Sequence, residues 1–275
     1  MNKKIDYHFE TRAIHEGLKD TPWKGATLPP IFQNAAHYHE SAESLSKTFA
    51  GQTQEHIYMR LSNPTNRFLE QKLASLESGA AAVVTGSGMA AINNACMTLL
   101  RSGDEFVASK ALFMSSYALF TAVFKKYGIN VKLVDPLRLE DIEQAINEKT
   151  RFVYMETITN PGMEIADIKS ISQIAHSNGI PLLIDNTLAS PWLCRPIELG
   201  ADIVLHSTTK YLSGHGGALG GVVVDAGNFN WANEKFSDFA PFVEQKGNLA
   251  FLHRLFKEHH INFGTTPAPL HSYLT

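Results

Sequence analysis

The chain has 275 residues, of which 44% are hydrophobic and 19% charged, and its formal net charge is −3. This composition is typical of a globular chain that fills one large domain or two ordinary ones. Nucleic acid is not an expected partner, because the sequence shows basic tracts only at Lys3-Lys4 and Lys125-Lys126.

The cysteines and the N-terminus indicate the compartment. Cys96 and Cys194 lie far apart in apolar surroundings and fit no metal spacing, which is typical of reduced thiols in the cytoplasm. Residues 1–6 carry lysines with no apolar run behind them, so we expect no signal peptide. No apolar stretch approaches membrane-spanning length, and we expect a cytoplasmic protein with no membrane partner.

Residues 1–65 show no clear hydrophobic periodicity and contain the breakers Gly25, Pro29, Pro30 and Pro64. A segment of this length without regular structure is uncommon inside a compact domain. We therefore expect an extended N-terminal arm that packs on another surface, such as that of a second subunit.

From residue 66 onward, short apolar strands alternate with helices. The first helix, expected at 66–77, places Phe68, Leu69 and Leu73 at helical spacing. Strands are expected at 81–85, 105–108, 130–134, 151–156, 181–185, 203–207 and 220–224. Further helices are expected at 89–100, 113–127, 139–147, 168–178 and 246–257. This alternation predicts an α/β domain over 66–260, with a mostly parallel sheet that binds ligands at the carboxyl ends of its strands.

A lysine and an aspartate follow two of these strands. Lys210 comes shortly after the strand that ends at Ser207, and Asp185 ends another strand 25 residues upstream. Pyridoxal phosphate needs both groups, because a lysine amine forms a Schiff base with its aldehyde and an acid keeps its pyridine nitrogen protonated. The pair therefore predicts a pyridoxal phosphate site that acts on amino acids. Asp185 alone would also fit a helix cap.

A glycine-rich turn offers a site for the phosphate. The strand at 81–85 runs into Gly86-Ser87-Gly88-Met89-Ala90-Ala91, whose small residues let an anion approach free N–H groups at the start of a helix. Ser207 and Thr209 could add hydroxyl donors. The same turn formally fits a dinucleotide fingerprint. That alternative fits poorly, because the next strand ends in Ser109-Lys110 and not in the acid that a dinucleotide requires.

Other residues have ordinary alternatives. Tyr58 and Arg60 could be an exposed strand pair, and the glycine-rich turn could serve only close packing of helix and strand. Glu156 could be a buried acid paired with a neighbour. His206 and His215 are expected to be structural, since no third ligand lies at metal spacing, and we expect no metal site.

A series of motifs runs from about Phe9 to the last residue. The motifs are Glu10-Thr11-Arg12-Ala13-Ile14-His15-Glu16-Gly17, Pro29-Pro30-Ile31, Tyr58-Met59-Arg60-Leu61-Ser62-Asn63-Pro64-Thr65, Leu76-Glu77-Ser78-Gly79, Ser87-Gly88-Met89-Ala90-Ala91, Glu156-Thr157-Ile158-Thr159-Asn160-Pro161, Asp185-Asn186-Thr187 and His206-Ser207-Thr208-Thr209-Lys210-Tyr211. Together they resemble the Cys/Met-metabolism family of pyridoxal 5'-phosphate enzymes, which has the aspartate-aminotransferase-like fold type I. Within that family, the opening motif resembles the O-acetylhomoserine sulfhydrylases most closely.

The resemblance implies a role for each matching residue. Lys210 would bind the cofactor covalently and move protons on the substrate, and Asp185 would pair with the pyridine nitrogen. Phe113 would stack on the ring, and Asn160 would lie near the cofactor's phenolic oxygen. The phosphate would be bound by Gly88, Met89, Ser207 and Thr209 and, from the neighbouring subunit, by Tyr58 and Arg60. The active site would thus be built by a dimer, within a homo-oligomer that is usually a tetramer.

The implied reaction is a γ-replacement on O-acetyl-L-homoserine by sulfide or a small thiol, giving homocysteine or methionine. Phe113 departs from the tyrosine that many relatives carry. Since a phenyl ring cannot donate a proton, this departure favours acetate over a thiolate as the leaving group. Cystathionine synthesis, cystathionine cleavage and methionine γ-lysis stay open as alternatives.

Residues 261–275 are expected to begin the connection to a C-terminal domain that relatives have and this chain lacks. In the family, that domain carries the arginine expected to bind the substrate carboxylate. A truncated, non-catalytic module that binds cofactor or another subunit is therefore a further alternative.

Overall fold

A seven-stranded sheet forms the centre of this computed structural model, which describes residues 7–18, 26–53 and 55–275. The strand order is β1-β7-β6-β5-β4-β2-β3, and β7 alone runs opposite to the others. The strands are β1 Ala81–Thr85, β2 Glu105–Ser109, β3 Asn130–Val134, β4 Thr150–Glu156, β5 Leu182–Asp185, β6 Ile203–His206 and β7 Gly221–Asp225. The mostly parallel sheet confirms the predicted α/β fold class. Residues 1–6, where no signal peptide is expected, lie outside the described residues.

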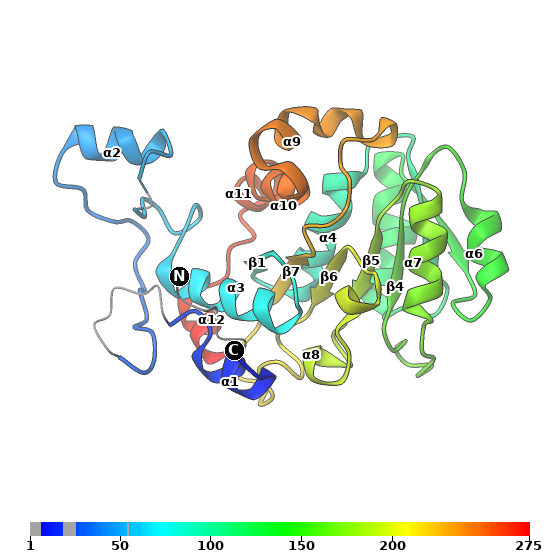
Figure 1. Cartoon of the computed structure of the whole chain (residues 1–275), viewed down its shortest axis with the longest axis horizontal. Helices are drawn as coiled ribbons and strands as arrows, with labels where there is room; N and C mark the ends of the chain where they lie inside the picture. Colours follow the sequence, from blue (N-terminus) through cyan, green and yellow to red (C-terminus); the bar gives the residue numbers. More distant parts are fainter. Residues whose placement is uncertain (1–6, 19–25, 54) are drawn as a thin grey trace.

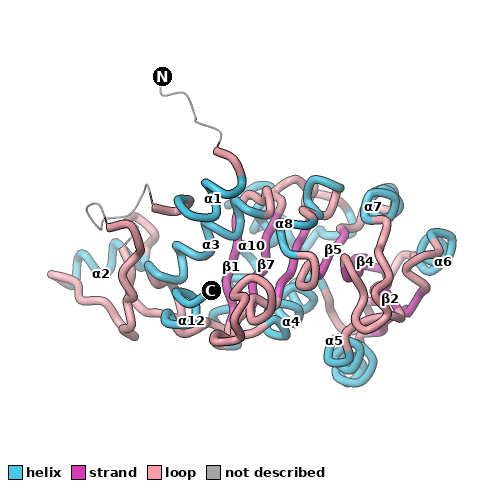
Figure 2. Tube along the Cα trace, turned by 90° about the horizontal axis from the view of Figure 1, so that it is seen from below, coloured by secondary structure: helices cyan, strands magenta, loops and turns pink. Residues whose placement is uncertain are grey.

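Helices cover both faces of the sheet (Figure 1). Helices α4, α5 and α10 pack on one face and α3, α6 and α7 on the other, and Figure 2 shows α5 and α7 on opposite sides of the strands. These helices are α3 Pro64–Leu76, α4 Gly88–Leu99, α5 Met114–Ala118, α6 Leu139–Ala145, α7 Ile168–Ser177 and α10 Ala250–Arg254. Because strands in such a layer are buried on both faces, they read as continuous apolar runs in the sequence.

The core is divided by the sheet. Val222 and Val224 of β7 point to the side of α3 and α7, whereas Val223 points to the side of α4, and all three are fully buried. On the α4 side, the rings of Phe106 and Phe152 stack with their centroids 4.7 Å apart. This two-sided burial holds the carboxyl ends of the parallel strands at one edge of the sheet.

Two helical regions differ from the expectation. The helix expected at 113–127 begins as α5 and continues as a π-helical turn and a 3-10 turn up to Tyr127. The helix expected at 246–257 is wrong at both ends. Helix α9, Ala240–Lys246, ends at Gly247, where φ is +54°, and a second helical stretch runs from α10 through α11, Ile261–Phe263. Glycine takes this backbone conformation without a Cβ clash, so the chain turns there.

The N-terminal region contains two short helices that the sequence analysis did not predict, α1 Phe9–His15 and α2 Ala42–Phe49. Helix α1 lies on the body of the protein, where the ring of Phe9 meets that of Trp192 in α8, Ser190–Leu193, with 5.4 Å between centroids. The first part of the expected arm therefore packs on its own domain.

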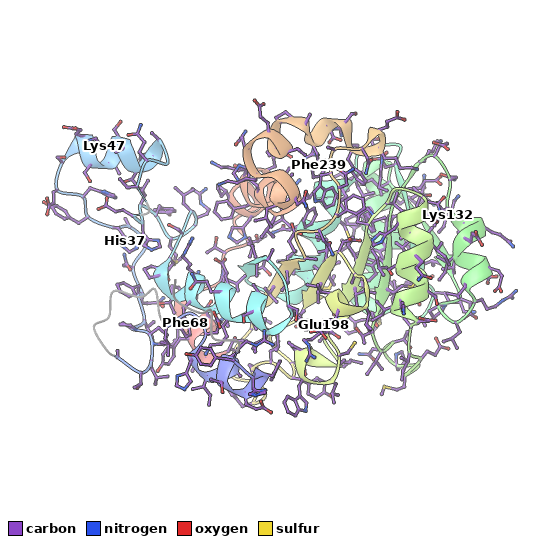
Figure 3. The ribbon with its side chains drawn as sticks, in the orientation of Figure 1. His37, Lys47, Phe68, Lys132, Glu198 and Phe239 are labelled. Atoms are coloured by element: carbon purple, nitrogen blue, oxygen red, sulfur yellow. The ribbon has the colours of Figure 1, made fainter. Side chains whose placement is uncertain are left out.

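Residues 36–53 and 55–61, which we call the outer arm, stand away from the sheet (Figure 1). Figure 3 places His37 and Lys47 on this segment, far from Phe239 beside the helices of the body. An antiparallel bridge between Ala36 and Tyr58 joins its two ends. The outer arm is thus a loop with α2 at its tip and not part of the layered core.

The end of the chain packs on α3. The Asn66 side-chain amide donates to the carbonyl of Pro267 at 3.3 Å, just before α12, Pro269–Leu274. The N–H of Leu270 in α12 donates to the side chain of Gln33 at 3.2 Å. Within the ranges that the structure describes, no helix combines the length and the apolar character needed to cross a membrane.

Candidate active site

A cavity of about 690 Å³ opens at the carboxyl ends of β4, β5 and β6, where open parallel sheets bind their ligands. Eight of the ten residues predicted from the sequence line this cavity. They are Gly88, Met89, Phe113, Asn160, Asp185, Ser207, Thr209 and Lys210. The remaining two, Tyr58 and Arg60, lie on the outer arm. The fold therefore brings most of the candidate site together from segments far apart in the sequence.

Hydrogen bonds from neutral groups hold the carboxyl of Asp185. Its Oδ1 accepts from the N–H of Thr187 at 3.0 Å and from the Thr187 hydroxyl at 2.5 Å, and its Oδ2 accepts from the Tyr154 hydroxyl at 3.3 Å. Burial raises the pKa of the Asp185 carboxyl, and the hydrogen bonds from Thr187 oppose that rise. The positive charge of a protonated pyridine nitrogen would favour the ionised carboxylate further, so this residue fits its predicted role.

The first turn of α4 and the end of β6 form a concave anion site. The Ser87 hydroxyl caps α4 by accepting from the N–H of Ala90 at 3.1 Å, while the N–H groups of Gly88 and Met89 have no acceptor within the helix. A Cβ on Gly88 would come within 2.6 Å of the Ser207 Cβ. Glycine therefore allows the helix N-terminus and the Ser207 hydroxyl to face one phosphate group, which the helix dipole also favours.

Lys210 follows β6 in a turn that is fixed by its own backbone. Its N–H donates to the carbonyl of Ser207 at 3.2 Å, and its carbonyl accepts from the N–H of Gly214 at 2.9 Å. The hydroxyl of Thr209 accepts from the N–H of Gly220 at 3.1 Å and donates to the Gly220 carbonyl at 3.2 Å. A phosphate would thus compete with that carbonyl for the Thr209 proton. The turn leaves the Lys210 side chain on the same cavity as Asp185.

Glu156, the last residue of β4, was expected from the sequence only as a buried acid paired with a neighbour. Its Oε1 accepts from the N–H of Phe113 at 2.8 Å, and its Oε2 accepts from the N–H of Asn160 at 3.1 Å. Burial raises the pKa of the Glu156 carboxyl to about 7, and the nearby charge of Asp185 adds to the rise. One side chain therefore fixes both segments that are predicted to contact the cofactor ring. Its place at a strand end was the only signal in the sequence.

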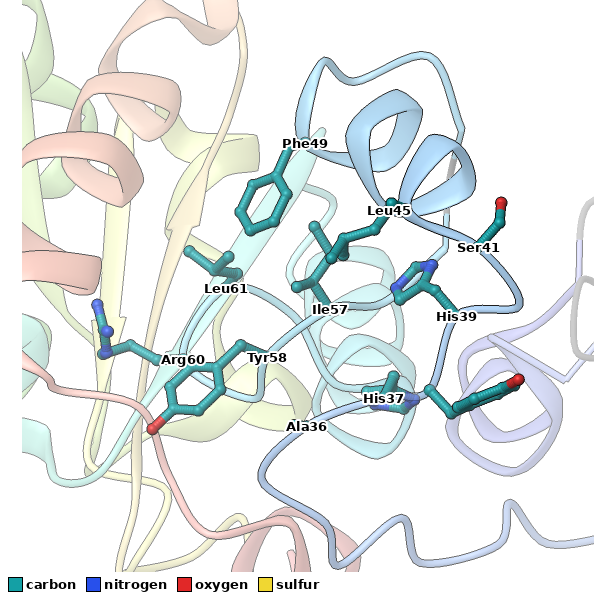
Figure 4. Close-up of a pocket in the computed structure, with 12 residues that line it drawn as sticks. Ala36, His37, His39, Ser41, Leu45, Phe49, Ile57, Tyr58, Arg60 and Leu61 are labelled. Carbon is teal, nitrogen blue, oxygen red and sulfur yellow. The ribbon is translucent and has the colours of Figure 1, made fainter.

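Tyr58 and Arg60 line a different hollow of about 650 Å³ in the outer arm (Figure 4). The guanidinium of Arg60 lies over the Tyr58 ring, 5.3 Å from its centroid, and donates to the carbonyl of Ile261 at 3.2 Å. Figure 4 shows Leu45 and Phe49 of α2 beside the same hollow. Within one chain, these two residues do not line the cavity of Lys210. Their contact with a neighbouring subunit's phosphate stays a prediction.

The two histidines that were expected to be structural, His206 and His215, each have a hydrogen-bond partner within the chain. His206 Nε2 lies 2.5 Å from Glu77 Oε1, and His215 Nε2 lies 3.2 Å from the carbonyl of Leu274. Among the residues that the structure describes, no group of three or more His, Cys, Asp or Glu side chains is placed to hold a metal ion.

A lysine, a carboxyl with neutral hydrogen-bond partners and a helix N-terminus share one cavity at the edge of a mostly parallel sheet, and this combination fits the pyridoxal phosphate site predicted from the sequence. The chain belongs to the family described as Cys/Met metabolism PLP-dependent enzyme, whose model matches residues 10–275. The cofactor of this family is pyridoxal phosphate, which confirms the resemblance and the cofactor predicted from the sequence.

Two curated relatives illustrate the range of reactions in the family. An O-acetyl-L-homoserine sulfhydrylase from Leptospira meyeri is 41% identical over 230 residues, which cover 84% of this chain and 52% of that protein. An L-methionine gamma-lyase from Porphyromonas gingivalis is 44% identical over 217 residues, which cover 78% of this chain and 54% of that protein. The chain spans about half the length of these relatives.

A solved structure agrees with the fold and the cofactor. It is that of a putative O-acetylhomoserine (thiol)-lyase from Campylobacter jejuni with N'-pyridoxyl-lysine-5'-monophosphate. Its TM-score is 0.90 at 31% identity, over 98% of this chain and 69% of that chain. Since the relatives differ in the reaction that they are named for, family membership alone does not select one reaction for this chain.

Proposed function

We propose that this chain is the cofactor-binding part of a transferase that replaces the acetate of O-acetyl-L-homoserine by sulfide or a small thiol. The products would be acetate and homocysteine or, with methanethiol, methionine. The observation that carries the choice of substrate is the phenyl ring of Phe113 in the cavity shared by Lys210 and Asp185.

Lys210, Asp185 and Ser207 would each have a task in this reaction. Pyridoxal phosphate, when bound, supplies the electron sink for negative charge that develops at the substrate Cα. The Lys210 amine would accept protons from Cα and Cβ and return them after sulfur has bonded to Cγ. Asp185 would hold the proton of the pyridine nitrogen, while Ser207 and the first turn of α4 would bind the phosphate. Acetate leaves with the electron pair of the Cγ–O bond, and the thiolate supplies the pair of the new C–S bond.

Phe113 separates the candidate leaving groups. Its N–H is held by Glu156, and its ring is 41% exposed beside the cavity. A strongly basic leaving group needs a proton as it departs, and a phenyl ring has none to give. Acetate is a weak base, whereas the methanethiolate released from methionine is a stronger one. The ring at this position therefore supports an acylated homoserine as the substrate.

Methionine γ-lysis is the second candidate, and the 44% identity with an L-methionine gamma-lyase supports it. A proton donor other than Phe113 would then have to serve. Tyr211 carries a hydroxyl, lines the same cavity and is 65% exposed.

A second subunit would complete the site. The hollow of the outer arm presents apolar surface, since Phe49 is 64% and Tyr58 is 42% exposed. Burial of these rings against another copy of the chain would bring Tyr58 and Arg60 toward the cofactor phosphate in the Lys210 cavity of that second copy. Within their own chain, the two residues do not line that cavity.

Product analysis tests the proposed reaction. Purified protein with pyridoxal phosphate is given either O-acetyl-L-homoserine with sulfide or L-methionine alone. We expect homocysteine and acetate from the first mixture, and from methionine only traces of methanethiol and 2-oxobutyrate. Faster breakdown of methionine would favour the lyase, and no turnover of either substrate with cofactor bound would favour a non-catalytic module. Phe113→Tyr should shift the ratio toward methionine cleavage.

A further inference from the structure

A buried acid links the ends of two strands beside the cavity. Glu77 follows α3 and has 0% of its surface exposed. Its Oε1 accepts from the side-chain amide of Asn186 at 2.9 Å and lies 2.5 Å from His206 Nε2. Asn186 directly follows β5, and His206 is the last residue of β6. One carboxylate oxygen of Glu77, the residue after α3, therefore contacts residues at the carboxyl ends of both β5 and β6.

The two strand ends joined by Glu77 carry the predicted cofactor contacts. Asn186 follows Asp185, and His206 precedes Ser207. A second link lies one residue further along, because the Thr187 hydroxyl donates to Asp185 and accepts from the N–H of Ser207 at 2.8 Å. The position of the Asp185 carboxyl relative to the phosphate-binding Ser207 thus depends on how these strand ends are held together.

Both the oxygen and the nitrogen of the Asn186 side-chain amide form hydrogen bonds. Its Oδ1 accepts from the Thr157 hydroxyl at 2.7 Å, and its Nδ2 donates to the carbonyl of Cys194 at 2.9 Å as well as to Glu77. Thr157 directly follows β4, so the network also reaches the strand that carries Glu156. The second carboxylate oxygen of Glu77 is buried and has no hydrogen-bond partner among the described residues.

We infer that Glu77 is a positioning residue for the cofactor site, which sets the spacing between the Asp185 carboxyl and Ser207 through its bonds to Asn186 and His206. The role is geometric: a neutral acceptor in the same place would serve as well as a carboxylate. The inference rests on the cofactor site and not on the proposed γ-replacement, and it is tested without any substrate. Its failure is therefore distinguishable from a failure of the proposed reaction.

The test compares Glu77→Leu with Glu77→Gln. Leucine removes both hydrogen bonds, whereas the glutamine Oε1 accepts from the same two donors, and its NH2 replaces an oxygen that has no partner among the described residues. The matched control is Asp202→Asn. Asp202 is 2% exposed and bonds to His176 at 2.8 Å, but it lies at the other end of β6, away from the cavity.

Pyridoxal phosphate is titrated into each apoprotein, and the visible absorbance of the bound cofactor is followed with pH. For Glu77→Leu we expect the affinity to fall by about tenfold or more, because both hydrogen bonds that hold the strand ends together are lost, and the pH midpoint to shift. Glu77→Gln should stay within about threefold of wild type, the effect of at most one hydrogen bond. Asp202→Asn should lower the melting temperature and leave affinity and spectrum unchanged.

Three results would overturn the inference: an unchanged affinity and spectrum in folded Glu77→Leu, a glutamine variant as weak as the leucine variant, or an equal loss in Asp202→Asn. If Glu77→Leu does not fold, Asn186→Ser decides. It removes one of the two bonds to Glu77 and should weaken cofactor binding by at least about threefold. No loss of affinity in Asn186→Ser would then reject the positioning role.

Discussion

The cavity at the sheet edge and the hollow of the outer arm both contain residues predicted to bind the cofactor, but they are built differently. In the cavity, Asp185 accepts three hydrogen bonds and Glu156 accepts two, and each accepts one of them from a distant segment, Tyr154 or Phe113. In the hollow, Arg60 lies over the Tyr58 ring and donates one hydrogen bond to the carbonyl of Ile261, and the aromatic surface around the pair is open. The body of the chain thus assembles its part of the site alone, whereas the outer arm holds residues whose proposed partner is another molecule.

The two regions also differ in how their titratable groups respond to burial. In the body, burial raises the pKa of Glu156 and that of Asp225 to about 7. In the outer arm, burial lowers the pKa of His56 to about 4 and lowers that of His37. Burial disfavours the charged form in both cases, so acids and bases shift in opposite directions. The buried carboxyls of the body and the buried imidazoles of the outer arm should therefore respond to pH with opposite signs.

The largest effect should come from the body. Lys210→Ala removes the amine that would bind the cofactor covalently, so we expect loss of borohydride-trapped cofactor and loss of all turnover. The measurement is mass spectrometry of the reduced protein, in which the label should be found on the peptide of residue 210. Lys169→Ala, at an exposed position of α7, is the matched control and should keep both the trapped cofactor and the turnover of wild type. Label elsewhere in the wild type would refute the assignment.

Asp185→Asn should have the next largest effect. An amide cannot stabilise the proton of the pyridine nitrogen as a carboxylate does, and removal of one such buried electrostatic contact costs about 10²–10³ in kcat. Single-turnover rates with excess cofactor check this. Asp167→Asn is the control, because either side chain can cap α7, and it should change nothing. Turnover of Asp185→Asn within about threefold of wild type would show that Asp185 does not pair with the cofactor ring.

The outer arm is tested by mixing two variants. Arg60→Ala should weaken cofactor binding by about tenfold to a hundredfold, the loss of a charge-assisted hydrogen bond. When Arg60→Ala protein is mixed with Lys210→Ala protein and the subunits are re-associated, the mixture should regain about a quarter of wild-type activity at low cofactor concentration. The reason is that half of the random dimers contain both variants, and each of these dimers has one intact site out of two. Lys210→Ala mixed with Asp185→Asn is the control. These two lesions lie on one cavity and should not complement each other.

No recovery in the first mixture would contradict a site shared between subunits. Recovery in both mixtures would mean that Lys210 and Asp185 do not serve the same site, which would undo the comparison between body and arm. Only recovery limited to the Arg60 mixture supports the proposed division of the site.

The sheet and the core of the site could be predicted from the sequence because they depend on local signals. All seven strands appear within one residue of their expected bounds, since each is an apolar run between breakers. Lys210 and Asp185 were found because both follow such runs, and parallel strands end at one edge. The glycine-rich turn was recognisable from its spacing between β1 and α4.

The parts that were missed depend on contacts between distant residues. Nothing near Glu77 in the sequence indicates His206, which lies 129 positions away, and Glu156 meets Phe113 across 43 positions. The break at Gly247 interrupts an otherwise helical pattern. Helix α2 spans only eight residues and buries only Thr48, and an isolated helix of that length is marginal in water.

Gly88→Ala tests the anion site with a smaller change. The new Cβ would lie 2.6 Å from the Ser207 Cβ and 2.9 Å from its Cα, so helix and strand end must separate. Such overpacking costs about 1–3 kcal/mol, and we expect pyridoxal phosphate affinity to fall by about tenfold. Gly86→Ala is the matched control, because its nearest contact would be an ordinary 3.5 Å. Equal losses in both variants would show that the close approach of Gly88 is not special.

The smallest effect concerns pH in the outer arm. His56 Nδ1 lies 2.8 Å from the Ser62 hydroxyl, and its ring centroid lies 5.3 Å from that of His37. Burial, with the positive charges of His37 and Arg67, lowers the pKa of His56 to about 4 from the usual 6.5. The closed arm therefore binds fewer protons than the open chain between these values. Its stability is full above pH 6.5 and is lost as pH falls toward 4.

Hydrogen exchange measures this difference between the two regions. From about pH 7.5 to about pH 5.5, after correction for intrinsic rates, opening of residues 36–62 should increase by about tenfold at most. Strand β7 should change the other way: the pKa of Asp225 is raised from 3.8 to about 7, so its contribution to stability is full at low pH and is lost as pH rises. His56→Gln should reduce the pH dependence of the arm to the part that His37 contributes and leave that of β7 unchanged. Equal responses in both regions would show that the outer arm is as firmly part of the core as the strands.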